Sequence, residues 1–379
     1  MDQVVQVLVV DDSKVFRSIL GKILSSIPDV QVVGSLGKGA DVLEFLKFRA
    51  VDLVTLDVEM PEMNGLETLR KMIEQKASFK AMPDVLMISS LTRTGSDITL
   101  KSLELGAFDF IAKPGANMQN AQEHLDRMLR NTISAWRTKQ ALGIAKQTRL
   151  GSRPTVISQP AVQPTVVQQT VGQKYPIAAP SPHTKPIMAI VLGVSTGGPK
   201  SLSEMLPKLC EVTDLPILMV QHMPPNFTKS LAESLSAKCK HTVVEGEAGM
   251  IVQPNYVYIA PGGNHMTVRS RGVNYVIEIN QDPPENGCRP SVDVLFRTAA
   301  RAFPDDSLVG IILTGMGNDG TPSLPEMKKK NAYLIAQDEE TSVVYGMPRA
   351  AAATGLLNKV ASLTSIPDAV LERIHMVKR

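Results

Sequence analysis

The stretch VQVLVVDDSKVFRSILGKILSSIPDVQVVGSL, residues 5–36, contains two short apolar runs separated by a segment with helical spacing. The apolar runs, at 5–10 and 30–36, have the length of buried strands, and the helical segment begins at Ser13. Each further apolar run also precedes a helical segment; these runs are at 51–56, 84–89 and 107–112. Five continuous apolar strands, each followed by a helix, predict an α/β fold with a parallel sheet covered on both faces.

The second half of the chain has the same organisation. Apolar runs that end in glycine, serine or histidine occur at 187–195, 217–223, 256–262 and 308–315, and 333–337 is a further candidate strand. The two halves do not repeat each other in sequence, so they predict two different doubly wound, parallel-sheet domains. A length of 379 residues agrees with two domains of about 100–200 residues and a linker.

A segment of unusual composition separates the two halves. Residues 127–186 contain nine Lys or Arg and no Asp or Glu, and Leu150–Pro186 contains seven prolines and five glutamines. Because proline interrupts both helices and strands, this composition predicts a disordered, basic linker, preceded by a helix over 121–139. We therefore expect a first domain at 1–126, the helix and linker at 127–186, and a second domain at 187–379.

The charge and apolar composition exclude several classes of protein. The formal charge of +3 comes from the linker, and neither flanking domain offers the basic face that nucleic-acid binding needs. The apolar runs are too short to cross a bilayer, and the acidic N-terminus enters a strand at once, unlike a signal peptide. Three cysteines without metal-type spacing favour a reducing compartment. We expect a cytoplasmic protein with no transmembrane segment and no nucleic-acid partner.

Three acidic residues follow strands of the first domain. Asp11 and Asp12 come after the first strand and Asp57 after the third, and these two strands are neighbours in a doubly wound sheet. Carboxylates crowded at one sheet edge repel one another unless a hard divalent cation binds among them. The cluster therefore predicts a Mg²⁺ site, although Asp12 or Ser13 alone is equally well explained as a helix cap.

A hydroxyl group and an ammonium group are expected at the same edge. Ser89 ends the fourth strand, Lys113 follows the fifth, and Phe110 lies three residues before this lysine, where it is placed to sense the site. Three acids, a serine and a lysine in this order are far harder to explain as independent caps.

This domain resembles the receiver domain of two-component response regulators, a flavodoxin-like fold, over its whole length. The resemblance rests on DD at 11–12, DVEMPEMNGLE from Asp57, SS at 89–90 and KP at 113–114. It implies that a histidine kinase phosphorylates Asp57, with Mg²⁺ held by Asp11, Asp12 and Asp57. It also implies two phosphoryl-contacting residues and a reporting aromatic, which are Ser89, Lys113 and Phe110.

The second domain opens with GVSTGGP at 193–199, which joins an apolar strand to a helix beginning near Pro199. The pattern G-x-S-x-G at such a turn is typical of a nucleophile elbow, which exposes the hydroxyl of Ser195 above the sheet. Free N–H groups at the helix N-terminus, with Thr196 as a candidate, stabilise a developing oxyanion. The same pattern also fits a glycine-rich anion-binding turn, or a plain tight turn, without covalent chemistry.

A nucleophilic serine needs a base and an acid that orients this base. Of the six histidines, His222 and His265 follow strands, and His222 is the stronger candidate because it ends the strand expected beside Ser195. Asp319 follows an apolar run within GIILTGMGNDG, whose glycines could also present the Met316 N–H as an oxyanion donor. The competing acids do not directly follow so apolar a run; they are Asp282, Asp293 and Asp338.

The order Ser–His–Asp differs from the Ser–Asp–His order of α/β-hydrolases. The second domain is instead similar to the catalytic domain of the chemotaxis protein-glutamate methylesterases, a Rossmann-like fold. The motifs that carry this similarity are GVSTGGP, QHMPPNFT, YIAPGGNHM, RPSVDVLF, LTGMGNDG and AQDEETSVVYGMPRAA. The resemblance implies a triad of Ser195, His222 and Asp319 that demethylates glutamate methyl esters without a cofactor.

Two functions from different classes fit the sequence. The first is a phosphorylation-activated serine hydrolase that acts on chemoreceptors, demethylating glutamate esters and deamidating glutamines, with a chemotaxis histidine kinase as phosphodonor. The second is a receiver-controlled protein-binding module without hydrolysis. The presence of all three triad positions favours the hydrolase.

Overall fold

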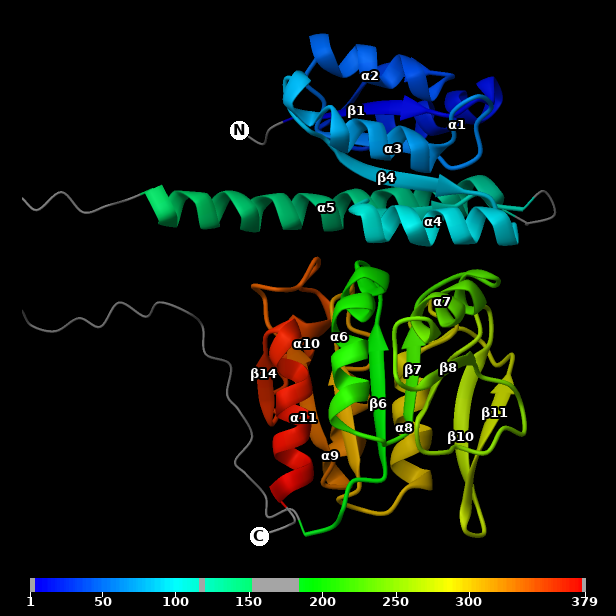
Figure 1. The fold of residues 1–379 in the computed structure, drawn as a ribbon, viewed down its shortest axis with the longest axis vertical. Helices are drawn as coiled ribbons and strands as arrows, with labels where there is room; N and C mark the ends of the chain where they lie inside the picture. The colour runs from blue at the N-terminus through cyan, green and yellow to red at the C-terminus, as the bar shows by residue number, and fades with distance from the viewer. Residues whose placement is uncertain (1–3, 116–119, 152–183, 377–379) are drawn as a thin grey trace, which may run out of the picture.

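Two parallel β-sheets, one in each half of the chain, organise the structure (Figure 1). The computed structural model describes residues 4–115, 120–151 and 184–376. Most of the segment expected to be a disordered linker lies in 152–183, outside the described residues. Both halves are α/β units with parallel sheets, which confirms the predicted fold class.

The N-terminal domain has a five-stranded sheet in the order β2-β1-β3-β4-β5, in which every pair is parallel. Its strands are β1 (Val5–Val10), β2 (Val30–Leu36), β3 (Leu53–Asp57), β4 (Asp84–Ser89) and β5 (Asp109–Ala112). Its helices are α1 (Lys14–Ser25), α2 (Gly39–Phe48), α3 (Gly65–Glu74), the short 3₁₀ helix η1 (Lys76–Ser78) and α4 (Arg93–Leu105). As predicted, β1 and β3 are neighbours, so the acids that follow them share one edge of the sheet.

Capping residues fix where two of these helices begin. Ser13 accepts a hydrogen bond from the Phe16 N–H at the start of α1. At the start of α3, Asn64 and Glu67 form a reciprocal capping box. The cap at Ser13 directly follows the two adjacent acids after β1, so it also holds the turn that carries them.

Helix α5 (Ala121–Gly151) is longer than predicted. The sequence predicts an end near Lys139, which is wrong by about three turns. No proline occurs between Pro114 and Pro154, so no residue in this stretch forces the helix to end. The proposed domain boundary at residue 126 falls inside this helix. Its buried residues include Leu129 and Trp136, which pack on the N-terminal sheet.

The C-terminal domain has a seven-stranded parallel sheet in the order β14-β13-β12-β6-β7-β9-β8. The strands that the sequence predicted are all present: β6 (Ala189–Val194), β7 (Ile217–Gln221), β9 (Tyr256–Ile259), β12 (Leu308–Ile312) and β13 (Tyr333–Gln337). Four strands were not predicted: β8 (Thr242–Glu245), β14 (Lys359–Ala361), and the antiparallel hairpin of β10 (His265–Arg271) and β11 (Asn274–Asn280).

Six α-helices and a 3₁₀ helix complete this domain. They are α6 (Gly198–Val212), α7 (Phe227–Ser236), α8 (Val292–Ala302), α9 (Leu324–Lys329), α10 (Met347–Ala353), η2 (Leu363–Ser365) and α11 (Ile366–His375). Within the described residues, no helix combines the length and the apolar composition needed to cross a membrane.

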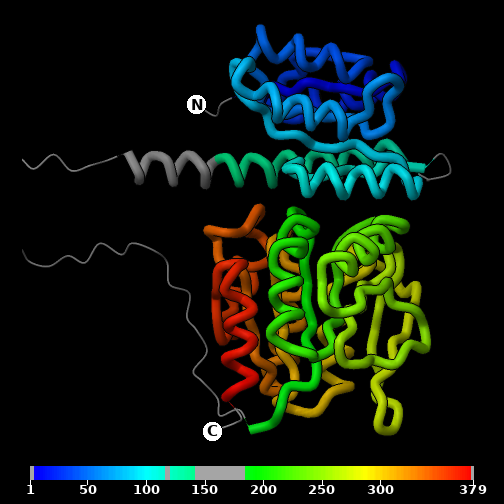
Figure 2. Tube along the Cα trace, in the orientation of Figure 1, coloured from blue at the N-terminus to red at the C-terminus, as the bar shows by residue number. Residues whose placement is uncertain are grey.

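The two domains are in direct contact. The chain trace in Figure 2 shows the blue and cyan N-terminal domain resting on one end of the C-terminal domain. At this contact, α4 packs against α6 and α7. Because α6 and α7 begin just after the carboxyl ends of β6 and β7, the N-terminal domain covers the sheet edge where ligands bind in α/β proteins.

Candidate functional sites

Lys113 joins two buried acids of the N-terminal domain. Asp11 follows β1, Asp57 ends β3 and Lys113 follows β5, so three strands bring these side chains to one edge. The Lys113 Nζ atom lies 2.8 Å from Asp11 Oδ2 and 2.8 Å from Asp57 Oδ2. Both carboxylates are almost completely buried, so the cluster is a charged site set into the protein.

The Asp57 carboxyl group is harder to ionise than an ordinary aspartate. Burial raises its pKa to about 6; the hydrogen bond with Lys113 opposes this, and repulsion from Asp11 adds to it. Burial alone would lower the pKa of Lys113, but its contacts with Asp11 and Asp57 outweigh this effect and raise that pKa. Additional positive charge beside Asp57 therefore favours its ionised form.

Asp12 completes a set of oxygen ligands for a metal ion. Asp11, Asp12 and Asp57 each offer a carboxylate oxygen, and these oxygens lie within 4.8 Å of one another. Asp12 is exposed, so the cluster opens to solvent on one side. Since Mg²⁺ prefers carboxylate oxygens and retains several waters, this donor set fits that ion.

The other two residues expected at this edge point elsewhere. Ser89 is buried at the end of β4, and its Oγ donates to the carbonyl oxygen of Ser90 (3.2 Å). Phe110 on β5 stacks on Phe227 of the C-terminal domain, with ring centroids 4.5 Å apart and an interplanar angle of 18°. The aromatic residue expected to report phosphorylation is therefore in direct contact with the second domain.

The glycine-rich turn after β6 has the form of an elbow. Gly197 has a φ of 76°, in the left-handed region, and α6 begins at the next residue. A Cβ atom at Gly197 would also collide with the side chain of Val343. Glycine is therefore required here by both conformation and space. Ser195 is half-buried at the point where the strand turns into the helix.

Ser195 and His222 are neighbours across the sheet. Strands β6 and β7 pair with Val194 opposite Gln221, so the next residue of each strand lies alongside the other. The His222 N–H also donates to the carbonyl oxygen of Val194 (3.2 Å). Within the described part of the chain, Ser195 Oγ forms no hydrogen bond with the imidazole. Such contacts are often long in sites without substrate and tighten when substrate binds.

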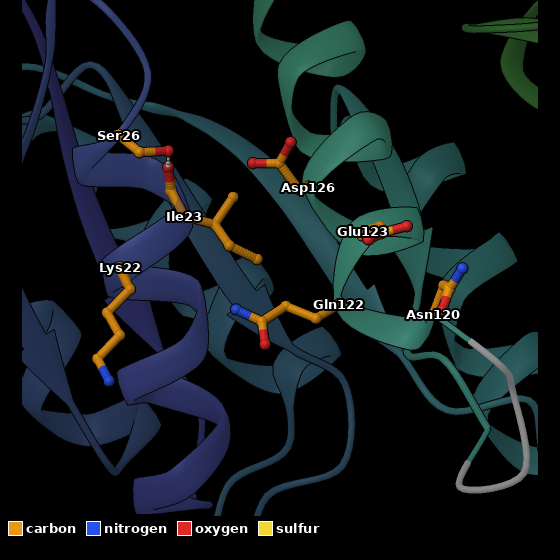
Figure 3. A pocket seen from close by; sticks show the side chains of 7 residues that line it. All are labelled: Lys22, Ile23, Ser26, Asn120, Gln122, Glu123 and Asp126. Atoms are coloured by element: carbon orange, nitrogen blue, oxygen red, sulfur yellow. Dashed lines mark hydrogen bonds between the residues drawn. The ribbon is translucent and has the colours of Figure 1, made fainter.

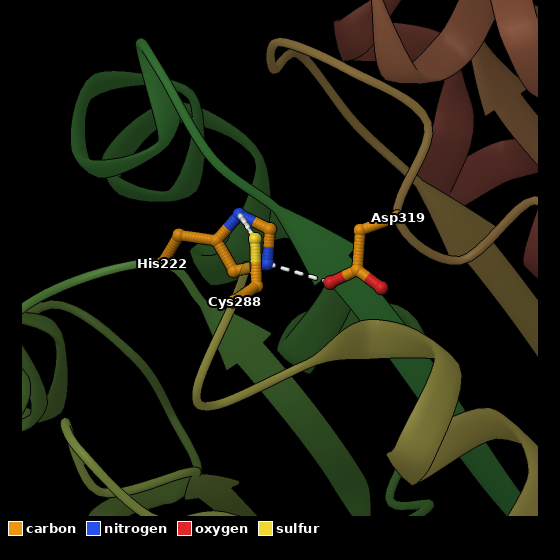
Figure 4. Close-up of side chains that lie close together, drawn as sticks. All are labelled: His222, Cys288 and Asp319. Atoms are coloured by element: carbon orange, nitrogen blue, oxygen red, sulfur yellow. Dashed lines mark hydrogen bonds and ion pairs between the residues drawn. The ribbon is translucent and has the colours of Figure 1, made fainter. Parts of the chain in front are cut away.

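His222 is hydrogen-bonded to Asp319, with 2.7 Å between Nε2 and Oδ2 (Figure 4). Asp319 is only 3% exposed, and its carboxylate accepts four further hydrogen bonds. These come from the backbone N–H groups of Val292 (2.7 Å), Asp293 (3.1 Å) and Gly320 (3.1 Å) and from the hydroxyl of Ser291 (2.8 Å). The acid is thus held rigidly in place behind the imidazole.

These contacts move the two pKa values apart. Burial raises the pKa of Asp319, but the hydrogen bond with His222 and the backbone N–H groups outweigh it and lower this pKa to about 2. Burial lowers the pKa of His222, but Asp319 and the nearby Cys288 outweigh it and raise this pKa to about 10. The buried carboxylate therefore makes the imidazole a stronger proton acceptor.

The competing candidates of the sequence analysis have other partners. His265 is completely buried, with Nε2 3.2 Å from the carbonyl oxygen of Pro283. Asp293 accepts from the Ser323 N–H (2.7 Å), and Asp338 accepts from the Thr341 N–H and hydroxyl. Asp282 is exposed. Within the described residues, Asp319 is the acid that contacts His222.

The two candidate oxyanion donors lie on either side of the elbow. Thr196 directly follows Ser195, and its carbonyl oxygen accepts from the Thr314 hydroxyl (2.9 Å). Met316 follows Gly315, where an added Cβ atom would lie 2.7 Å from Ser195 Cβ. The loop after β12 therefore runs against the elbow, and donation by the Thr196 and Met316 N–H groups remains a prediction.

Sequence reasoning missed two side chains beside His222. Cys288 Sγ lies 4.0 Å from His222 Nδ1, and Gln221 Nε2 donates to the carbonyl oxygens of Ser195 (3.0 Å) and His222 (3.3 Å). Gln221 was detectable, because it is a polar residue at the end of an otherwise apolar strand. Cys288 was not, because its loop has no strand or helix pattern to place it.

Two ion pairs and a hydrogen bond join the two domains. Arg93 pairs with Glu233 (2.9 Å) and Glu104 with Lys238 (2.5 Å), each pair joining α4 to the α7 region. Asn226 Nδ2 also donates to the carbonyl oxygen of Leu91 (2.8 Å).

Asp109 extends this contact to the residue beside Ser195. Burial raises the pKa of Asp109 to about 6, while the backbone N–H of Phe110 and an interaction with the Thr196 side chain oppose this. A side chain of the N-terminal domain thus approaches the residue that follows the candidate nucleophile.

A separate cavity of about 640 Å³ lies in the N-terminal domain (Figure 3). It is bordered by α1 and α5, with Lys22 on one side and Gln122 and Asp126 on the other. None of its lining residues belongs to either candidate site.

Comparison with known proteins accounts for both domains. The family described as CheB methylesterase matches residues 190–370, and the response regulator receiver domain matches residues 7–125. A protein-glutamate methylesterase/protein-glutamine glutaminase from Desulfotalea psychrophila is 41% identical over 375 residues, covering 98% of this chain and 98% of that protein. A protein of the same name from Pyrococcus abyssi is 38% identical and covers 99% of this chain and 95% of that protein.

A solved structure matches the C-terminal half. The Thermotoga maritima CheB methylesterase catalytic domain shares 39% sequence identity, with a TM-score of 0.48, and the match covers 49% of this chain and 98% of that chain. The full-length relatives match both domains in the order found here. The chain therefore belongs to the CheB family of protein-glutamate methylesterases/protein-glutamine glutaminases, which join a receiver domain to a methylesterase domain.

Proposed function

We propose that this protein is a phosphorylation-activated serine hydrolase that removes methyl groups from glutamate esters on chemoreceptor cytoplasmic helices. It also deamidates glutamines in the same receptors. The observation that carries this proposal is the buried Asp319–His222 hydrogen bond beside the elbow serine, in a chain whose full-length relatives bear this name. An ester and an amide pass through the same kind of tetrahedral intermediate, so one site can serve both reactions.

The first half of the reaction forms an acyl-enzyme. Ser195 Oγ attacks the γ-carbonyl carbon while the imidazole of His222 accepts the hydroxyl proton. Because Nε2 is engaged with Asp319, Nδ1 is the nitrogen that takes this proton. Asp319 holds the tautomer and stabilises the imidazolium. The developing oxyanion is stabilised by backbone N–H groups, for which Thr196 and Met316 are the candidates.

The second half releases the products. His222 returns its proton to the leaving group, so methanol leaves from an ester and ammonia from an amide. Water then attacks the acyl-enzyme, again with His222 as base, and its proton is finally returned to Ser195 Oγ. The receptor keeps a glutamate carboxylate in both cases.

Phosphorylation of Asp57 is proposed to relieve the cover that the receiver places over this site. The carboxylates of Asp11, Asp12 and Asp57 would hold Mg²⁺, which when bound neutralises charge during phosphoryl transfer. Lys113 contacts Asp57 at one end of β5, and Phe110 contacts the methylesterase domain from the same strand. A histidine kinase of the chemotaxis system is the proposed phosphodonor.

A binding module without hydrolysis, the alternative left open by the sequence, is not favoured. The relatives that match over nearly the whole chain are named as enzymes. In addition, a serine, a histidine and a buried acid converge at one sheet edge, which partner binding alone does not require.

Two measurements on the full chain test the proposal. A fluorophosphonate should label Ser195 after treatment with Mg²⁺ and a small phosphodonor such as acetyl phosphate. Mass spectrometry of methylated receptor fragments should show loss of methyl esters and conversion of glutamine to glutamate. Labelling at another residue would reassign the nucleophile, and unchanged receptor fragments would contradict the proposed substrate.

A further inference from the structure

Cys288 and the ring nitrogen of His222 that does not contact Asp319 form a donor pair suited to a thiophilic metal (Figure 4). Cys288 Sγ is 4.0 Å from Nδ1, whereas Nε2 on the other side of the ring is hydrogen-bonded to Asp319. One donor atom from each of the three residues lies within 4.8 Å of the others. The proposed hydrolysis gives Cys288 no role, so its position beside the imidazole calls for another explanation.

We propose that Zn²⁺ binds between His222 Nδ1 and Cys288 Sγ, and that the bound ion inhibits the enzyme. The inhibitory half rests on the proposed function, because Zn²⁺ occupies the lone pair on Nδ1 that accepts the Ser195 proton. The binding half stands on the donor set alone. The Zn–S and Zn–N bonds form as the Cys288 thiol proton and the proton carried on Nδ1 of the His222 imidazolium leave to solvent, so no oxidant or reductant is needed.

The geometry requires little rearrangement. Two ligands on a tetrahedral Zn²⁺, with a sulfur at about 2.3 Å and a nitrogen at about 2.0 Å, lie about 3.5 Å apart. The observed separation of 4.0 Å exceeds this by an amount that a small side-chain rotation removes. Waters complete the coordination shell.

Asp319 hydrogen-bonds to the opposite nitrogen of the His222 ring and does not act as a metal ligand. Its carboxylate already accepts five hydrogen bonds, including the one with His222 Nε2, so it is not free to turn toward the metal. A carboxylate on the far nitrogen of a metal-binding histidine fixes its tautomer and strengthens it as a ligand. The contact that prepares His222 as a base therefore also prepares it for Zn²⁺.

The chemistry of the donors separates this site from the receiver site. Thiolate and imidazole select Zn²⁺ and related ions, whereas the three carboxylates around Asp57 suit Mg²⁺. The His222 side chain is 16% exposed and Cys288 is half-buried, so an ion can reach both. An excess of Mg²⁺ should saturate the carboxylate site while leaving the Cys–His pair free.

Co²⁺ provides a direct readout of this site. We would titrate the metal-free full chain with Co²⁺ in excess Mg²⁺ and record near-ultraviolet absorption, where a cobalt–thiolate bond gives a charge-transfer band. We expect the band in the native chain, its loss in Cys288→Ser, and its weakening in His222→Gln. Cys239→Ser is the matched control, because this cysteine is also half-buried but interacts with Cys210 and does not belong to the donor group of His222, and it should keep the band. No band, or a band that survives Cys288→Ser, would overturn the proposal.

Inhibition is then measured on the same proteins. Zn²⁺ should inhibit ester hydrolysis by the native chain, and a chelator should restore it. The Zn²⁺ concentration for half-inhibition should rise at least tenfold in Cys288→Ser, with each variant compared with its own zinc-free rate. Equal sensitivity in the two proteins would place the inhibitory ion elsewhere. A chain that shows the cobalt band but no zinc-free hydrolysis would instead contradict the proposed function and leave metal binding intact.

Discussion

Phe110 of the receiver domain stacks on Phe227 of the methylesterase domain, with their ring centroids 4.5 Å apart. Phe110 lies on β5, three residues before the lysine that contacts Asp57, and directly after Asp109, which reaches Thr196. One short strand therefore connects the candidate phosphoacceptor to the candidate nucleophile. If β5 shifts when Asp57 gains a phosphoryl group, the movement would be transmitted directly to the turn that carries Ser195.

Reversing one charge at the domain contact should activate the enzyme. Glu104 lies 2.5 Å from Lys238, and Glu104→Lys would place two ammonium groups together. Loss of this pair together with the new repulsion amounts to about 1 kcal/mol, which would raise the unphosphorylated rate about fivefold. Ester hydrolysis without a phosphodonor measures this effect.

The matched control for this change is Glu44→Lys on α2. It makes the same change of charge, and Glu44 pairs with Lys47 of its own helix. Figure 1 places α2 on the side of the receiver away from the methylesterase domain. If both variants hydrolyse esters at the native rate, the α4 contact does not restrain the enzyme.

Asp57→Asn should remove the response to phosphodonors and also stabilise the receiver. The pKa of Asp57 is raised from 3.8 to about 6, so its favourable contribution is complete below pH 4 and is lost as the pH rises through 6. At neutral pH the ionised group therefore costs stability, up to about 3 kcal/mol, which asparagine avoids.

Thermal unfolding of both proteins, with chelator and with Mg²⁺, measures this effect. We expect Asp57→Asn to unfold at the higher temperature in chelator, and Mg²⁺ to stabilise the native chain more than the variant. A native chain that is the more stable of the two in chelator would show that the contact with Lys113 outweighs the burial of the carboxylate.

The sequence predicted every strand of the first sheet and the central strands of the second, but not the edge strands β8 and β14 of the second sheet. The long apolar strands, such as β6 and β12, were predictable because burial on both faces leaves a continuous apolar run. The three-residue strand β14 and the hairpin of β10 and β11 lack such runs, since a short edge strand or a half-exposed hairpin needs few apolar residues. The end of α5 was missed because Gly143 does not end the helix and no proline occurs before Pro154.

The site residues that directly follow strands were predictable from the sequence, whereas those that loops or the domain contact bring together were not. Ser195, His222 and Asp319 each follow an apolar run, which places all three at one edge of a parallel sheet. Cys288 approaches His222 from a loop, and Phe227 meets Phe110 across two domains. Such contacts depend on tertiary and interdomain packing, which leaves no periodic pattern in a single sequence.

Ser195→Ala should reduce hydrolysis by about four orders of magnitude or more, because the members of a triad act as a unit. His222→Ala should be nearly as severe. His265→Ala is the informative comparison: this imidazole is fully buried, so its loss should lower thermal stability while the remaining folded protein keeps its rate. Equal loss of kcat in the two histidine variants, at equal folded fraction, would reopen the choice of base.

The pH dependence of hydrolysis should report the Asp319–His222 contact. His222 accepts a proton only when neutral, and its pKa is raised from 6.5 to about 10. We therefore expect kcat/KM of the full chain to keep rising with pH above 7, instead of levelling off near 7 as an unperturbed histidine would give. Asp319→Asn removes the carboxylate that holds the proton on the imidazole, so the rise should move to lower pH while the maximal rate falls. By linkage, the same contact stabilises the fold below pH 6.5 and is lost as the pH rises through 10, so thermal unfolding of the native chain and Asp319→Asn should converge at high pH. If Asp319→Asn leaves the position of the rise unchanged, the group that titrates is not the histidine held by this acid.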